Sequence, residues 1–155
     1  MRAKRTVTVL SSDIRPALPN ETIRFTHKNR KNMKPEYKPF VDALIELAIR
    51  EDIGDGDHTS LCCIPATEKG RMRLLCKQEG ILAGIEIAQL VLRRLDPDMQ
   101  FEQILRDGDR VKPGDVAFYV SGRLQSLLQA ERILLNIMQR MSGVATQTAV
   151  YVKRL

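Results

Sequence analysis

The stretch from residue 124 to residue 143, LQSLLQAERILLNIMQRMSG, constrains the fold of this chain more than any other. Its apolar residues recur mainly at steps of three and four, which is the period of an amphipathic helix. Gly143 favours an end of that helix, because glycine is common just beyond a helix C-terminus. The sequence therefore predicts one long helix with an apolar stripe. The stripe comprises Leu124, Leu127, Leu128, Leu134, Leu135, Ile137, Met138 and Met141.

A charged pair, Glu131 and Arg132, lies in the middle of this stretch. Neighbours on a helix point about 100° apart, so the two side chains are not expected to pair directly. Arg140 follows eight residues after Arg132, about 80° around the axis and about 12 Å along it. Guanidinium groups suit bidentate binding of carboxylates or phosphates. The pattern leaves two interpretations of Arg132 open, a solvated helix face and a ligand site.

Shorter elements are predicted before the long helix. Met72, Leu74 and Cys76 alternate with Arg71, Arg73, Leu75 and Lys77. Val116, Phe118 and Val120 alternate with Ala117, Tyr119 and Ser121, and both patterns are typical of strands. Strands broken by helices favour an α+β fold, with a mostly antiparallel sheet and packed helices. The first expected element is an amphipathic helix over residues 38–51, with Asp42, Glu46 and Arg50 outward. Strands within 61–85 and a helix over 85–95, which Asp96-Pro97 ends, are expected to follow. Strands and two turns (107–109 and 112–115) are expected within 101–122, and a second short helix over 144–155.

The acidic segment EDIGDGDHTS, residues 51–60, holds four carboxylates and His58. It does not match an EF-hand loop, because the glycines are misplaced and the twelfth position lacks a Glu. We favour a structured turn, in which Gly54 and Gly56 permit positive φ, over a metal site. The three cysteines, Cys62, Cys63 and Cys76, are odd in number and fit no zinc spacing. Reduced thiols in a cytoplasmic protein are the favoured interpretation, and a redox or metal role is the alternative.

Residues 1–32 carry the basic charge of the chain. They hold eight Lys or Arg and two acids, whereas residues 33–155 hold seventeen of each sign. A transit peptide, a basic arm for nucleic acid and a disordered extension upstream of a start at Met33 are the three interpretations, and we favour the extension. The neutral remainder, without Trp, gives no reason to expect nucleic acid as a partner. No run of eighteen apolar residues suggests a membrane span.

No complete catalytic set can be assembled from the sequence pattern. The chain has only two histidines, His27 and His58, and it lacks a nucleophile elbow, a P-loop and a GxGxxG motif. We therefore expect no catalytic residue and no metal ligand in this chain.

Four segments together resemble the quinolinate phosphoribosyltransferases. They are ALIELAIREDIGDGDHTS, EGILAGIE, DGDRVKPGD and AERILLNIMQRMSGVATQTA, in this order over residues 38–151. The resemblance implies an N-terminal α+β domain followed by an α/β barrel. It also implies transfer of the phosphoribosyl group of phosphoribosyl pyrophosphate to quinolinate, with magnesium, giving nicotinate mononucleotide, pyrophosphate and CO2 in de novo NAD biosynthesis. The resemblance further implies a homodimer or higher homo-oligomer, with each active site shared between two subunits.

The resemblance assigns roles to three residues of the long helix. Arg132, in the AER motif, corresponds to the arginine that binds a quinolinate carboxylate in the neighbouring subunit's site. Glu131 and Arg140 are expected to be supporting residues. Glu131 would orient the helix or Arg132, whereas Arg140, like Ser142, is expected to be structural. The family's barrel, with its magnesium ligands, would begin just after Leu155. We therefore expect a fragment, inactive alone, with a basic extension (1–32), an N-terminal domain (33–143) and the start of a linker helix (144–155).

Two alternatives of other kinds remain. The turns at 107–109 and 112–115 resemble those of biotinyl and lipoyl carrier domains, which would make the chain a non-catalytic binding module. A carrier needs a lysine at a hairpin tip, and Lys112 lies in the wrong turn for that role. The other alternative is a paralogue of the same fold that is linked to molybdenum transport.

Overall fold

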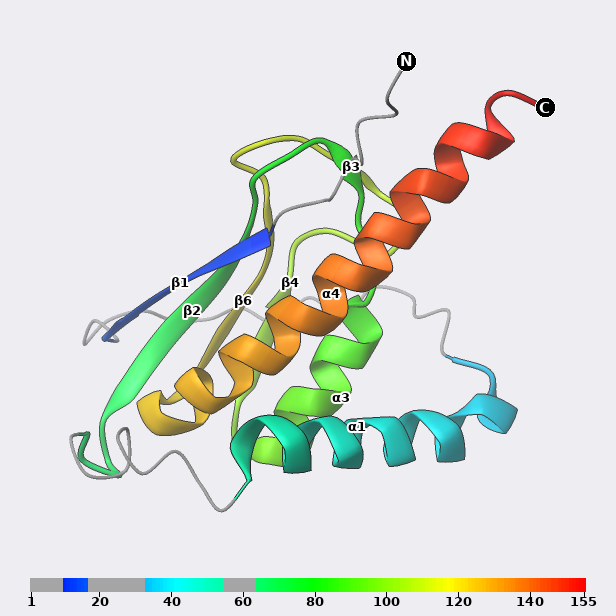
Figure 1. Ribbon diagram of the computed structural model, residues 1–155. Coiled ribbons are helices and arrows are strands. Elements are labelled where there is room, and N and C mark those ends of the chain that lie inside the picture. Colours follow the sequence, from blue (N-terminus) through cyan, green and yellow to red (C-terminus); the bar gives the residue numbers. More distant parts are fainter. Residues whose placement is uncertain (1–9, 17–32, 55–63) are drawn as a thin grey trace.

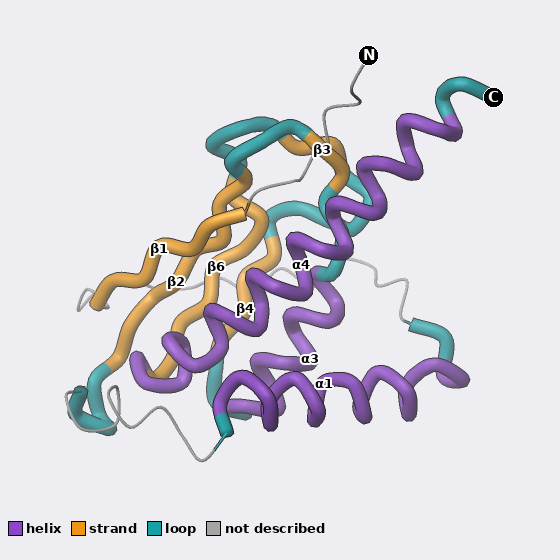
Figure 2. The backbone as a smooth tube through the Cα atoms, in the orientation of Figure 1, coloured by secondary structure: helices purple, strands orange, loops and turns teal. Residues whose placement is uncertain are grey.

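The computed structural model describes residues 10–16, 33–54 and 64–155. Within these ranges, four strands form an antiparallel sheet in the order β1-β2-β6-β4, and β3 pairs with β5. The described helices lie on one face of the larger sheet (Figures 1 and 2). The predicted α+β class is confirmed. The elements are β1 (Leu10–Pro16), η1 (Pro35–Tyr37), α1 (Lys38–Ile53), β2 (Lys69–Cys76), β3 (Gly80–Ile81), α3 (Ile85–Leu95), β4 (Gln100–Gln103), β5 (Arg110–Val111), β6 (Val116–Arg123) and α4 (Leu124–Val152).

The two central strands follow the predicted alternation, with one exception. Met72, Leu74 and Cys76 of β2 are fully buried against the helices. In β6, Ala117 is also fully buried, although the pattern predicts it outward. A bulge explains this error, because Leu74 pairs with Phe118 whereas Leu75 pairs with Val116, so that the register skips Ala117.

Helix α3 forms where predicted, but the strand expected around residues 61–66 is wrong for its described part. Ile85, Ala88, Val91 and Leu92 of α3 are buried, and the helix ends immediately before Asp96. Residues 64–68 form a bend and a turn, in which the N–H of Glu68 donates to the carbonyl of Pro65. Proline cannot donate a ladder hydrogen bond, which disfavours a strand at this place.

Helix α1 is apolar on two faces, and only one of them contacts the core. Ile45 is buried, whereas Phe40 and Leu44 are 70 % and 65 % exposed. Asp42 and Glu46, predicted to face solvent, lie within ion-pair distance of Arg94 on α3. The choice between the two apolar faces is made by α3 and α4, against which α1 packs.

Helix α4 continues through Gly143, so the predicted helix end there is wrong. It runs for 29 residues, and the separate short helix predicted over 144–155 is its last part. A glycine in a helix interior costs only about 1 kcal/mol relative to alanine. Tertiary contacts on either side of Gly143, made by Ser142 and Thr146, fix the helix there. The C-terminal end of α4 projects beyond the rest of the described chain (Figure 1).

Part of the predicted N-terminal extension belongs to the sheet. Leu10–Pro16 pairs with β2 over seven residues as strand β1, and Leu10 is buried, so the expectation of disorder is wrong for this segment. Its residues alternate between the helix side and the open side of the sheet, a pattern too short to stand out among charged residues. The remainder of residues 1–32 lies outside the described residues. Among the described helices, none combines the length and the apolar content that crossing a membrane would require.

Candidate functional site

Arg132 lies on the surface of α4, on the side away from the sheet core. Ala130, Ile133 and Leu134 are buried, and this orientation leaves the Arg132 side chain 77 % exposed. The cation is therefore presented to solvent by a helix whose neighbouring residues are fixed in the core. A guanidinium in this setting is available to bind a carboxylate or phosphate of a ligand.

The nearest acid of Arg132 comes from α1. The Nε atom of Arg132 lies 3.5 Å from Oδ1 of Asp52, whose side chain is 22 % exposed. Asp52 lies one residue before the end of α1, at the point where that helix meets α4. From the sequence, Asp52 is predicted only to be part of an acidic turn. A sequence pattern does not show that residue 52 contacts residue 132, which lies 80 residues further along the chain. The segment that follows, residues 55–60, with His58 and Gly56, lies outside the described residues.

Glu131 has a different partner from Arg132, in agreement with the predicted divergence of neighbouring helical side chains. The hydroxyl of Ser12 on β1 donates a hydrogen bond to Oε1 of Glu131. A second contact joins the same elements, because Nε2 of Gln139 donates to the carbonyl of Leu10 over 2.9 Å. Two hydrogen bonds therefore join strand β1 to the middle of α4, and the supporting role predicted for Glu131 stays a prediction.

Arg140 is exposed and is not brought to Arg132. It lies eight residues further along α4, which corresponds to about 12 Å along a helix axis. The two arginines therefore need not serve one site. The supporting role predicted for Arg140 stays a prediction.

Ser142 and Thr146 attach α4 to the segment between β3 and α3. The Ser142 hydroxyl accepts from the N–H of Ala83 over 3.0 Å and donates to its carbonyl over 3.1 Å, and Ser142 is fully buried. The Thr146 hydroxyl accepts from the N–H of Ile81 over 2.8 Å. Two of the segments that carry the family resemblance, around residues 79–86 and 131–149, therefore contact each other directly. Ser142 is structural, as expected.

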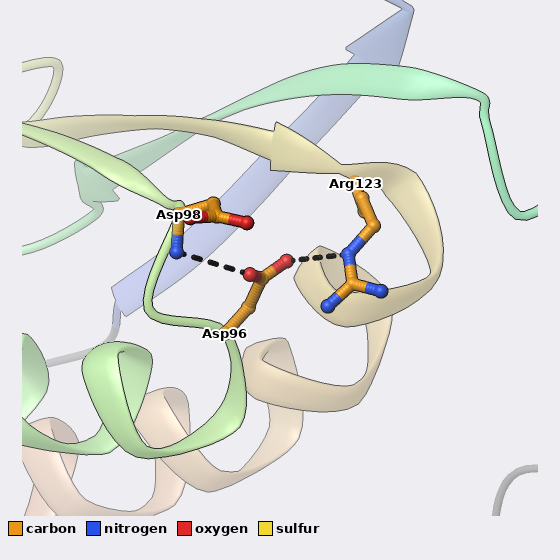
Figure 3. Close-up of polar contacts among 3 residues, drawn as sticks. All are labelled: Asp96, Asp98 and Arg123. Carbon is orange, nitrogen blue, oxygen red and sulfur yellow. Dashed lines mark hydrogen bonds and ion pairs between the residues drawn. The ribbon is translucent and has the colours of Figure 1, made fainter.

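The start of α4 is held by a buried acid at the end of α3 (Figure 3). Oδ2 of Asp96 accepts from Nε of Arg123 over 2.8 Å, and Oδ1 accepts from the N–H of Asp98 over 3.1 Å. The hydrogen bond from Arg123 holds the pKa of Asp96 below its ordinary value of 3.8, although burial acts in the opposite direction. We call this contact the Asp96–Arg123 clamp. Sequence reasoning missed it, because only the Asp-Pro pair drew attention to residue 96.

The two predicted turns have the same geometry. In each, the fourth residue donates its N–H to the carbonyl of the first: Asp109 to Arg106, and Asp115 to Lys112, both over 3.1 Å. Gly108 and Gly114 have positive φ of 94° at the third position, as in type II turns. The first turn also contacts the start of α3, because Oδ1 of Asp107 accepts a hydrogen bond from the N–H of Ile85. These turns position the elements that contact α4, and Lys112 is exposed in the second of them.

The open face of the sheet carries a second group of charges. Arg73 pairs with Asp13 over 2.8 Å, Arg71 pairs with Glu102 over 3.4 Å, and the Arg71 guanidinium lies 4.2 Å from the centre of the Tyr119 ring. These side chains border a shallow cavity of about 260 Å³. Its basic residues already have acidic or aromatic neighbours, so this face has a weaker claim to be a ligand site than Arg132.

Neither a reactive thiol nor a metal site appears among the described residues. Burial and the neighbouring charge of Asp115 raise the pKa of the Cys76 thiol from 9.0 to about 11, which suppresses the reactive thiolate. In the described ranges, no three His, Cys, Asp or Glu side chains gather as metal ligands. Cys62 and Cys63 lie outside these ranges.

Comparison with known proteins gives the following matches. The family profile described as the quinolinate phosphoribosyl transferase N-terminal domain matches residues 57–142. The quinolinate phosphoribosyltransferase (decarboxylating) 1 of Nicotiana glauca is 41 % identical over 119 residues, which cover 75 % of this chain and 34 % of that protein. The chloroplastic nicotinate-nucleotide pyrophosphorylase (carboxylating) of Arabidopsis thaliana shows the same identity and coverage.

A solved structure agrees with these matches in three dimensions. The crystal structure of NadC from Streptococcus pyogenes superposes with a TM-score of 0.73 at 31 % identity, over 80 % of this chain and 43 % of that one. The chain spans about a third of the length of the curated plant relatives it matches. The likeness therefore concerns one domain of those proteins.

Proposed function

This chain belongs to the quinolinate phosphoribosyltransferase family, and on that premise we propose that it supplies the N-terminal domain of an enzyme of de novo NAD biosynthesis. The reaction transfers the phosphoribosyl group of phosphoribosyl pyrophosphate to quinolinate. Nicotinate mononucleotide, pyrophosphate and CO2 are the products. The exposed Arg132 on a firmly held helix is the observation that carries this proposal.

The proposed role of Arg132 is to bind one carboxylate of quinolinate in the active site of a neighbouring subunit. A planar guanidinium forms two parallel hydrogen bonds with a carboxylate, which fixes the orientation of the ligand as well as its position. The Ser12, Asp96 and Ser142 contacts hold α4 at its middle, its start and its C-terminal half. A helix held in this way presents the cation at a constant place, which lowers the cost of aligning the substrate.

Residues 1–155 are proposed to be inactive without the barrel domain of the family. Arg132 is a binding group, and binding one carboxylate of quinolinate does not by itself transfer the phosphoribosyl group. The described residues do not fit magnesium, since they offer no cluster of ligands. Any magnesium would be bound by the barrel. Nicotinate mononucleotide formation by the purified 155-residue chain would overturn this part of the proposal.

The test of the Arg132 role uses a chimera in which residues 10–155, which include β1, replace the matching segment of the Nicotiana glauca relative. In this chimera, Arg132→Ala is expected to raise the KM for quinolinate at least about tenfold, because it removes a charge-assisted bidentate contact. The KM for phosphoribosyl pyrophosphate should change little. Asn136→Ala is the matched control, since it replaces an exposed polar residue one turn further along the same helix. Equal quinolinate KM values for the Arg132→Ala and parent chimeras would refute the role.

A homodimer is proposed as the functional assembly. Exposed apolar side chains on α1 and at the C-terminal end of α4 include Phe40, Leu44, Val144 and Val152, each at least 63 % exposed. Exposed apolar side chains in such number favour association. Light scattering of the chain at micromolar concentration is expected to give at least twice the monomer mass of 17.6 kDa, and a monomer would contradict it.

The cytoplasm is proposed as the location, although the Arabidopsis thaliana relative is named chloroplastic. The pairing of Leu10–Pro16 with β2 supports retention of this segment in the mature protein, because its removal would expose the edge of β2. Mass spectrometry of the N-terminus of the protein from its own cells would test this. A mature N-terminus after residue 16 would contradict it.

A further inference from the structure

We propose that Asp52 is a positioning residue, which holds the Arg132 guanidinium by its Nε side and directs the terminal nitrogens toward a carboxylate ligand. This inference rests on the proposed function of Arg132. Its geometric basis is the approach of 3.5 Å between Arg132 Nε and Asp52 Oδ1, with Asp52 much less exposed than Arg132. The better-packed acid is the fixed partner, and the exposed arginine is the one whose orientation it sets.

Asp52 occupies a place that is unfavourable for an acid without a cation nearby. It lies in the last turn of α1, which ends at Ile53. The C-terminus of a helix carries a partial negative charge, so an acid there is destabilising. Arg132 offsets this repulsion across the contact between α1 and α4. Asp52 therefore favours the conformer of Arg132 that brings Nε toward it.

The other acid beside Arg132 is engaged elsewhere. Glu131 accepts the hydroxyl of Ser12 on the far side of α4. Among the described residues, Asp52 is thus the acid that pairs with Arg132. Because Glu131 pairs with Ser12 and Asp52 pairs with Arg132, Glu131 does not draw the guanidinium away from α1.

Because Asp52 lies beside Nε of Arg132, the two terminal nitrogens of the guanidinium stay available to a ligand. Arginine has five N–H donors, of which one is on Nε and four are on the terminal nitrogens. With Nε directed to Asp52, the terminal nitrogens of the exposed side chain remain for a bidentate carboxylate. A competing carboxylate would instead occupy those terminal nitrogens. The geometry thus favours an orienting role for Asp52 over competition with the substrate.

The test is NMR spectroscopy of the full 155-residue chain, in which the Nε–Hε signal of Arg132 is assigned with Arg132→Lys. The variant is Asp52→Asn. The matched control is Asp42→Asn, which removes an acid of the same helix whose nearby cation is Arg94. The exchange of the Arg132 Hε proton with water is expected to be about three- to fivefold faster in Asp52→Asn than in the parent or the control, as suits one exposed ion pair. Equal exchange rates in all three would overturn the inference.

A titration with quinolinate separates this inference from the function on which it rests. Because the barrel of a neighbouring subunit completes the proposed site, this titration uses the chimera described above, in which the apparent Kd for quinolinate is expected to be about three- to fivefold weaker in Asp52→Asn. A tighter Kd in Asp52→Asn would overturn the orienting role in favour of competition. An unchanged Kd would overturn it while the proposed ligand of Arg132 stands. Protection of Hε in the chain, together with an unchanged Kd for quinolinate in the Arg132→Ala chimera, would overturn that ligand and leave the Asp52–Arg132 contact intact.

Discussion

The guanidinium of Arg123 donates from Nε to the carboxylate of Asp96 over 2.8 Å, joining the end of α3 to the start of α4. Asp96 is 1 % exposed, whereas the Arg123 side chain is about half exposed. The buried acid also accepts the N–H of Asp98. The helix that carries Arg132 thus begins at a fixed point, because an unpaired carboxylate at this depth would be costly.

Asp96→Asn is expected to destabilise the chain by about 1–3 kcal/mol at about pH 6, since it weakens hydrogen bonds to a charged group. The loss of stability should be close to the lower of these two values, because the Arg123 side chain is partly exposed and solvent screens its charge. The difference between parent and variant should shrink in acid. Because the pKa of Asp96 is lowered in the folded chain, its ionised carboxylate contributes fully to the free energy of unfolding above pH 3.8, the ordinary pKa. This contribution is lost as the pH falls through the lower pKa of the folded state. Urea unfolding at several pH values measures this, and a difference that grows in acid would contradict it.

Gly143→Ala is expected to stabilise the chain by about 0.5–1 kcal/mol, because Gly143 lies inside α4 and alanine loses less backbone freedom in a helix. A Cβ at this position would meet nothing within 4 Å. Thermal unfolding should show a higher Tm for the variant. A lower Tm would mean that the helix ends near residue 143 after all.

Gly84→Ala is expected to be destabilising by about 2–4 kcal/mol, because two costs combine. Gly84 has a φ of 105°, and a Cβ there would lie 3.1 Å from Sδ of Met141 and 3.3 Å from Cγ of Met138 on α4. Strained backbone and overpacking each cost about 1–3 kcal/mol. Gly108→Ala is the matched control, since Gly108 has a φ of 94° but open space around it. Denaturant unfolding should therefore give a lower free energy of unfolding for Gly84→Ala than for Gly108→Ala. The reverse order would refute the close approach of Gly84 to α4.

Cys76 is expected to resist alkylation in the folded chain. A rise in pKa from 9.0 to about 11 lowers the thiolate fraction at about pH 8 by about a hundredfold. Burial slows the reaction further. Mass spectrometry of the Cys76 peptide after a timed iodoacetamide pulse, with and without urea, measures the ratio. Equal labelling of folded and unfolded chains would show that the site is open.

Elements with a clear period were predictable, and their errors have physical causes. The period of β2 identified the residues that this strand buries, because one face of it meets the core. In α1, Phe40 and Leu44 are as apolar as Ile45, and only packing against α3 and α4 decided which of them is buried. Ala117 was misplaced by a bulge, which depends on the partner strand and leaves no mark on the local pattern.

For the candidate site, the sequence by itself determined the residue type and its helical setting, an arginine beside an acid in a long apolar helix. It also determined the family, through four ordered segments whose turns and contacts require particular residues. Only the tertiary structure decided that α4 continues past Gly143, that Leu10–Pro16 joins the sheet, and that Asp52 rather than Glu131 lies beside Arg132. The reason is that local periodicity records which face of an element is apolar, whereas the partners of its charged residues come from segments far apart in the chain.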